Sequence, residues 1–142
     1  MLNIVIACDK AGIQMKNFLI ESLKNDYNII NLGTDSEEAV DYPDFAKKLT
    51  DKIVDGTAKF GILICGTGIG MSICANKVKG IRAALCHNSL EAKLTREHNN
   101  SNVICLGARI IGLEKALDNV KTFLNTEFSN IDRHVRRINK IE

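Results

Sequence analysis

The sequence predicts a three-layer α/β/α sandwich built on a five-stranded parallel sheet. Five short apolar runs, rich in isoleucine and valine, recur along the chain, and longer segments with apolar residues at helical spacing separate them. The runs are continuously hydrophobic rather than alternating, which is typical of strands buried on both faces. Strands that alternate with helices imply right-handed βαβ crossovers and a doubly wound sheet.

The predicted strands are residues 4–8, 28–32, 60–65, 81–86 and 103–106. Residues 4–8 are too short for a membrane span or a signal peptide, and Asp9 and Lys10 follow directly, so they are interpreted as a strand. The predicted helices are residues 14–23, 45–54, 70–78, 90–98 and 113–124. Pro43 is expected to open the second helix, because proline is tolerated at the first helical position.

The last segment, residues 130–142, has a narrow apolar stripe and a basic face. Taken alone, this pattern is most often a solvated surface helix. No linker, repeat or low-complexity tract interrupts the chain, so residues 1–142 are expected to form a single domain. Ligands of such sheets bind beyond the carboxyl ends of the strands. The candidate positions are therefore residues 9–10, 33–35, 66–70, 87–88 and 107–109.

The composition excludes several classes of function. Nineteen Lys and Arg residues against 17 Asp and Glu give a formal net charge of +2, which shows no general bias toward nucleic acid or a membrane surface. Five cysteines without a CxxC pair, in a chain without an evident targeting segment, point to a reducing cytoplasmic location. None of these cysteines has ligand spacing with another Cys or His, so no metal site is expected.

The segment 65–72, with the sequence CGTGIGMS, is the most informative part of the chain. Gly66, Gly68 and Gly70 lie between a predicted strand and a predicted helix, where several backbone N–H groups can converge on one anion. A dinucleotide fingerprint would place the third glycine one residue later, and a P-loop would need a lysine before Ser72. An oxyanion hole for an enolate fits better, with the Thr67 hydroxyl as an additional donor.

Cys65 stands at the mouth of this loop. Thiols near helix N-termini can exchange protons near neutral pH, which makes Cys65 a candidate general base. However, four of the five cysteines close predicted strands, and cysteine is among the most frequently buried residues. Position alone therefore favours an ordinary core thiol over a catalytic one.

Eight short motifs occur in order along the chain. They are IACD (6–9), DYP (41–43), ICGTGIG (64–70), ANK (75–77), GIRA (80–83), REHN (96–99), GAR (107–109) and RHVRR (133–137). As an ordered set covering essentially the whole chain, they resemble the type B ribose-5-phosphate isomerases, whose relatives include allose-6-phosphate and galactose-6-phosphate isomerases.

The resemblance implies a Rossmann-like domain that interconverts ribose 5-phosphate and ribulose 5-phosphate through an enediolate, in the non-oxidative branch of the pentose phosphate pathway. It implies no cofactor, no metal, and no nucleic-acid or membrane partner. It also implies a homodimer with shared active sites, in which the C-terminal helix reaches the partner subunit; whether dimers pair into tetramers is left open. The alternative substrate is a hexose 6-phosphate, and a second alternative is a non-catalytic phosphosugar-binding module.

The same resemblance assigns catalytic roles to the glycine loop. Cys65 matches the base that moves a proton between C1 and C2 of the sugar. Thr67 and the amides of Gly66, Gly68 and Gly70 match the loop that stabilises the enediolate. These roles agree with what isomerisation requires, namely a base beside the carbon acid and donors aimed at the oxygen that gains charge.

Further matches concern the sugar itself. Asp9 and His98 match the pair associated with opening the sugar ring, and Asn99 matches a sugar-binding position. Tyr42 matches a residue that lines the same pocket. His98 alone would more often be an ordinary helix-end histidine, and the match of the tetrapeptide REHN favours a functional role.

The phosphate group is expected to meet basic side chains. Arg109, Arg133 and Arg137 match the phosphate-binding arginines, some of which come from the partner subunit. Arg133 and Arg137 are one helical turn apart and can reach one phosphate from the same face. Lys10 stands where the family usually has a histidine near the phosphate, and a lysine can bind phosphate as a flexible point charge.

Overall fold

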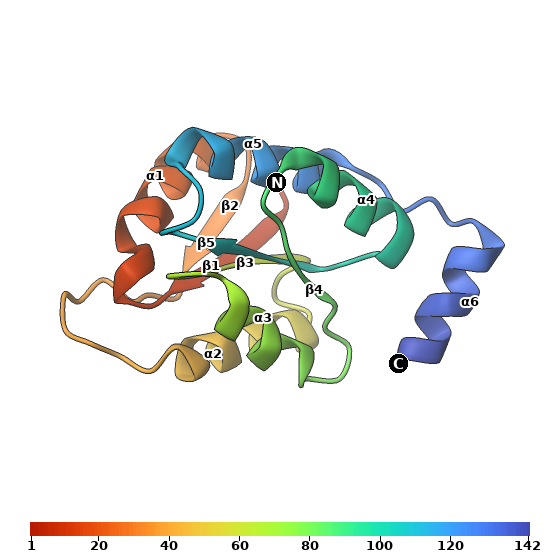
Figure 1. The fold of residues 1–142 in the computed structure, drawn as a ribbon, viewed down its shortest axis with the longest axis horizontal. Helices are drawn as coiled ribbons and strands as arrows, with labels where there is room; N and C mark the ends of the chain where they lie inside the picture. Colours follow the sequence, from red (N-terminus) through yellow and green to blue (C-terminus); the bar gives the residue numbers. More distant parts are fainter.

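A five-stranded parallel sheet lies between two layers of helices in the computed structural model, which describes all 142 residues (Figure 1). The strands are β1 (Asn3–Cys8), β2 (Asn28–Asn31), β3 (Phe60–Cys65), β4 (Ala83–Leu85) and β5 (Val103–Gly107). Their order across the sheet is β2-β1-β3-β5-β4, and every neighbouring pair is parallel. The predicted Rossmann-like α/β/α sandwich is confirmed.

The helices divide between the two faces of the sheet. One face is covered by α1 (Ile13–Leu23), α4 (Ser89–Asn99) and α5 (Leu113–Asn125), and the other by α2 (Tyr42–Val54) and α3 (Ile69–Asn76) (Figure 1). The last helix, α6 (Asp132–Ile141), lies beyond these layers beside the end of α4. A short 3₁₀ turn, η1 (Lys10–Gly12), joins β1 to α1 and was not predicted. None of the helices is long and apolar enough to span a membrane.

The continuous hydrophobicity of the central strands is explained by two separate cores. In β1, Ile4 and Ile6 pack under α1, α4 and α5, whereas Val5 and Ala7 pack against α2 and α3. Strands β3 and β5 alternate in the same way between the two cores. Each of these strands therefore needs apolar side chains on both faces.

The edge strands differ from the prediction. Residues 28–32 and 81–86 were expected to be strands buried on both faces, but β2 and β4 are only partly buried and shorter than predicted. An edge strand has one neighbour only, so part of its surface stays uncovered. The second helix begins at Tyr42 rather than at residue 45, with Pro43 as its second residue.

The parallel order fixes where loops and helix ends lie. The segments after β1, β3 and β5 meet at the carboxyl edge of the sheet. The strand order changes direction between β1 and β3, because β2 is added on one side of β1 and the later strands on the other. Helix α4 returns the chain from the end of β4 to the start of β5, so α4 ends at the opposite edge. The six residues of β3 separate the two edges by about 20 Å.

Arg96 fixes the end of α4 from within. Its side chain is buried and lies over the rings of Phe60 and Phe123, 4.8 and 5.7 Å from their centroids. The guanidinium donates hydrogen bonds to the carbonyl oxygens of Thr126 (3.1 Å) and Ser101 (2.6 Å) and to Oδ1 of Asn100 (2.9 Å). Arg96 thereby connects the end of α4 to the start of β5 and to the segment after α5.

We expect Arg96→Ala to lower the free energy of unfolding by about 3 kcal/mol, because it removes aromatic packing and leaves buried carbonyl groups without a donor. Urea denaturation followed by circular dichroism measures this change. Lys93→Ala, at an exposed position of the same helix, is the control and should stay within about 0.5 kcal/mol of the wild type. Equal stabilities of the two variants would contradict this role of Arg96.

Candidate active site

A hollow of about 430 Å³ opens at the carboxyl edge of the sheet, and we call it the strand-end hollow. Seven of the residues singled out in the sequence line it: Asp9, Tyr42, Cys65, Gly66, Thr67, Gly70 and Arg109. Ile69 and Ile73 of α3 add an apolar wall that the sequence did not predict. The candidate positions 33–35 and 87–88, which follow the edge strands, do not line this hollow.

Cys65 is the last residue of β3 and lies at the floor of the strand-end hollow, with 5% of its surface exposed. Its sulfur accepts a hydrogen bond from the backbone N–H of Gly68 at 3.2 Å. Gly68 has φ +78°, a left-handed conformation that glycine adopts without strain, and α3 begins directly after it. The sulfur therefore lies beside a backbone amide donor and the N-terminus of a helix.

The other cysteines at strand ends are in a different environment. Burial raises the pKa of both Cys8 and Cys86 to about 12, and it raises the pKa of Cys105 well above the ordinary value. These three thiols stay protonated at neutral pH. The structure thus separates Cys65 from the core cysteines, which the sequence alone could not do.

The glycine loop and Tyr42 close one side of the strand-end hollow. A Cβ atom added to Gly70 would lie 2.5 Å from the Tyr42 ring, so only glycine allows the ring to approach this closely. Thr67 is exposed at the top of the loop, and its Oγ1 accepts a hydrogen bond from the Ile69 N–H at 3.2 Å. Gly70 therefore makes space for Tyr42 in addition to the expected role of the loop amides.

Asp9 and Arg109 come from the two strands that flank β3. The Asp9 carboxylate accepts a hydrogen bond from the Ala11 N–H at 3.0 Å and caps η1. The Arg109 N–H donates to the Gly66 carbonyl at 2.9 Å, which joins the segment after β5 to the glycine loop. Lys10, the first residue of η1, is exposed and does not line the strand-end hollow.

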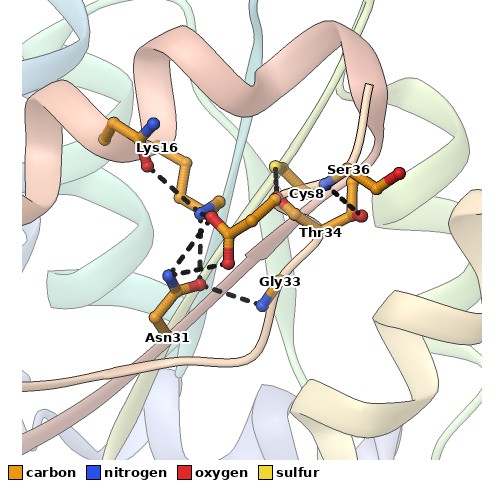
Figure 2. A network of polar contacts seen from close by, with 8 residues as sticks. Cys8, Lys16, Asn31, Gly33, Thr34 and Ser36 are labelled. Atoms are coloured by element: carbon orange, nitrogen blue, oxygen red, sulfur yellow. Dashed lines mark hydrogen bonds and ion pairs between the residues drawn. The ribbon is translucent and has the colours of Figure 1, made fainter. Parts of the chain in front are cut away.

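An ion pair between the buried Lys16 and the exposed Asp35 holds the segment that leads toward α2 (Figure 2). Lys16 has no exposed surface, and its Nζ lies 2.5 Å from Oδ1 of Asp35 and 3.2 Å from Oδ1 of Asn31. The hydrogen bond from Lys16 lowers the pKa of the Asp35 carboxyl group. Beside this pair, the Cys8 N–H donates to the Gly33 carbonyl at 2.8 Å. The segment after β2 is thereby fixed next to the residue that precedes Asp9.

Sequence reasoning missed Lys16, although a signal was present. Lys16 is spaced three and seven residues from Leu19 and Leu23, two fully buried residues of α1. A lysine at this spacing lies on the apolar face of its helix and needs a buried partner.

A second hollow, of about 320 Å³, lies between the end of α4 and α6, and we call it the tail hollow. It is lined by His98, Asn99, Arg133, His134, Arg137, Ile138 and Ile141. Four of these are predicted site residues, and His134 was not among the predicted ones. The structure gathers no group of three or more His, Cys, Asp or Glu side chains that could bind a metal ion.

Arg82 connects the two helices of the tail hollow. Its Nε donates to the Asn99 carbonyl at 2.8 Å, and its Nη2 donates to the Asn100 carbonyl at 3.0 Å. Its Nη1 pairs with the Glu142 carboxylate directly after α6. The sequence alone predicted no role for Arg82 of the GIRA motif. In the structure, Arg82 connects the end of α4 to the end of α6.

The predicted site residues of one chain therefore form two separate groups. Asp9, Tyr42, Cys65, Thr67 and Arg109 meet in the strand-end hollow. At the end of α4 and on α6, His98, Asn99, Arg133 and Arg137 meet in the tail hollow near the opposite edge of the sheet. Lys10 lines neither hollow. One chain alone does not bring the two groups together.

The chain is similar to known proteins along nearly its whole length. The family described as ribose/galactose isomerase matches residues 4–141. The crystal structure of a ribose 5-phosphate isomerase from Thermotoga maritima is 49% identical, with a TM-score of 0.96, and the match covers 99% of this chain and 97% of that one. A ribose-5-phosphate isomerase B structure from Clostridium thermocellum is 47% identical, also with a TM-score of 0.96, over 99% of this chain and 95% of that one. A D-erythrulose-4-phosphate isomerase from Pectobacterium atrosepticum is 46% identical over 90% of this chain and 86% of its own length.

We expect iodoacetamide at pH 8 to label Cys65 and Cys74 in the folded protein and to leave Cys8, Cys86 and Cys105 unlabelled. A thiol with a pKa of about 12 is ionised in about one molecule in ten thousand at this pH. Peptide mass spectrometry measures the labelling, with urea-unfolded protein as the control in which all five cysteines react. Labelling of Cys8 or Cys86 as fast as Cys65 would contradict the assignment.

Proposed function

Since the chain belongs to the ribose/galactose isomerase family and is a sugar-phosphate isomerase, we propose that it interconverts ribose 5-phosphate and ribulose 5-phosphate through an enediolate. The observation that carries the mechanism is the position of Cys65, whose sulfur accepts an amide hydrogen bond at the floor of the strand-end hollow. The names of the Thermotoga and Clostridium relatives support the pentose as substrate. This reaction belongs to the non-oxidative branch of the pentose phosphate pathway.

In the proposed reaction, the Cys65 thiolate removes the proton from C2 of the open-chain aldose and returns it to C1. The electron pair of the broken C–H bond forms the C1–C2 double bond of the enediolate, and the carbonyl electron pair moves onto O1. A proton then passes from O2 to O1 as C2 becomes the new carbonyl carbon, so the conversion is redox-neutral within the substrate. Thr67 and the amides of Gly66, Gly68 and Gly70 donate hydrogen bonds to the oxygen that gains negative charge. A base beside the carbon acid and donors at the oxyanion are the two requirements of this step.

The remaining residues are proposed to open the sugar ring and to hold its ends. Asp9 and His98 exchange protons with the ring oxygen and the anomeric hydroxyl, and Asn99 and Tyr42 contact sugar hydroxyls. The phosphate is held by arginines, for which Arg109 is present in the strand-end hollow.

We further propose that two copies of the chain complete each site, with the tail hollow of one facing the strand-end hollow of the other. The separation of about 20 Å between the edges of the sheet supports this arrangement, because no side chain spans that distance. Arg133 and Arg137 are exposed on α6, as are Ile131 and Ile141. A partner would cover these apolar side chains while the two arginines bind its phosphate, together with Arg109.

A different sugar phosphate is the alternative substrate. The Pectobacterium relative is named for D-erythrulose 4-phosphate, and Lys10 replaces a histidine near the expected phosphate position. The flexible side chain of a lysine can bind a phosphate in more than one position. Replacing the histidine by Lys10 is therefore expected to alter the preferred length of the sugar and to leave the reaction unchanged. Allose 6-phosphate and galactose 6-phosphate are further alternative substrates.

The proposal predicts turnover of ribose 5-phosphate by the purified protein at a higher kcat/KM than of allose 6-phosphate, galactose 6-phosphate or D-erythrose 4-phosphate. Cys65→Ala should lower kcat by about two to four orders of magnitude, the usual contribution of a general base. A preference for another sugar would keep the mechanism and change the substrate. If the kcat of Cys65→Ala stays within a few-fold of the wild type, a residue other than Cys65 is the base.

Shared sites predict complementation between two inactive variants. Cys65→Ala and His98→Ala chains, unfolded together and refolded, should recover about a quarter of the wild-type activity, because half of the dimers are mixed and each mixed dimer has one intact site. Refolding each variant alone is the control. If the mixture is no more active than the separate variants, each chain uses its own His98.

A further inference from the structure

His134 is a second imidazole beside His98 for which the mechanism above has no use. The two rings line the tail hollow together, one from α6 and the other from the end of α4. Their centroids are 4.6 Å apart and their planes are inclined by 42°. The two helices lie side by side at this end of the molecule (Figure 1).

The two histidines differ in how firmly they are held. His98 is exposed, whereas only 6% of the surface of His134 is accessible. Nδ1 of His134 is 2.6 Å from the Ser129 hydroxyl, a hydrogen bond that fixes the ring. The Ser129 N–H in turn donates to the Glu97 carbonyl at 3.2 Å. The anchor of His134 is therefore attached to the residue that directly precedes His98.

We propose that His134 is a positioning residue that holds the His98 imidazole at the tail hollow through ring-to-ring contact. The proposal rests on the proposed role of His98 in opening the sugar ring. An exposed side chain at a helix end samples several rotamers, and a fixed ring against one face reduces that number. Proton transfer to a ring oxygen requires such a defined orientation.

Burial and the surrounding charges favour the neutral form of the His134 ring. Burial lowers the pKa of His134, and the positive charges of Arg133, of protonated His98 and of Arg137 lower it further, while Glu97 opposes them. A neutral ring can pack against the His98 imidazole without repelling a positive charge on it.

Three variants test the contact. His134→Ala should lower kcat for ribose 5-phosphate by about tenfold and leave KM within about twofold, because Arg133 and Arg137 remain to bind the phosphate. His134→Phe should restore most of the lost kcat, since it returns an aromatic ring to the same position, and Ser129→Ala should fall between the two. Asn139→Ala, at an exposed position of α6, is the control. A kcat of His134→Ala within twofold of the wild type, or no recovery in His134→Phe, would overturn the proposal.

A second measurement does not depend on turnover. In ¹⁵N-labelled protein, NMR titration of the imidazole signals should show His134 protonating at a lower pH than a free histidine, as its lowered pKa requires. In Ser129→Ala and His134→Ala, the His98 ring signals should move toward those of a free histidine, whereas in His134→Phe they should stay closer to those of the wild type. Failure of the proposed function would appear as a wild-type protein inactive on ribose 5-phosphate. Failure of the positioning role would appear as His98 ring signals that Ser129→Ala and His134→Ala do not move.

Discussion

In a parallel sheet every strand ends at the same edge, and every connecting helix must carry the chain back to the opposite one. This constraint determines at which edge of the sheet each candidate site residue lies. Cys65 and Asp9 follow strands and lie at the carboxyl edge, whereas His98 and Asn99 close a helix and lie at the other. A rearrangement of the loops cannot move either group to the other edge of the sheet, because that would require a strand to run in the opposite direction. Under the shared-site proposal, a second copy of the chain supplies the group that one chain cannot bring to its own strand-end hollow.

Two buried cations, Lys16 and Arg96, and the partly buried Arg82 hold the segments that carry the candidate site residues. Lys16 fixes the segment after β2 beside the end of β1, and Arg96 connects the end of α4 to β5 and to the segment after α5. Arg82 ties the ends of α4 and α6 together. All three bind backbone carbonyl groups or short polar side chains near chain reversals, where helices and strands leave acceptors unpaired. Charge-assisted hydrogen bonds of this kind have defined directions, so they orient loops more precisely than apolar contacts do.

Local patterns predicted the fold better than they predicted the connections within it. The apolar runs identified β1, β3 and β5 almost to the residue, because a central strand has the same environment on both faces along its whole length. The edge strands β2 and β4 were expected to be buried because their runs look alike in sequence, and only the strand order shows that each lacks a neighbour. The strand-end hollow could be predicted from the residues that end or follow strands, but the partners of Lys16, Arg96 and His134 lie up to 36 residues away in sequence, as in the contacts of Arg96 with Phe60 and of His134 with His98. The periodic spacing of apolar residues does not reveal contacts between residues this far apart in the sequence.

Under the shared-site proposal, the last helix, α6, takes part in both subunit assembly and substrate binding. A helix of ten residues is marginal in water by itself, and within one chain α6 buries only His134 and Ile138 against the rest of the molecule. Its arginines face a hollow with no counter-charge, and its terminal isoleucines are exposed. Under the shared-site proposal, a partner covers the isoleucines and the substrate phosphate neutralises the arginines. A ligand that touches both subunits binds the dimer more tightly than the monomer, so substrate binding must strengthen subunit association by the same free energy with which association strengthens binding.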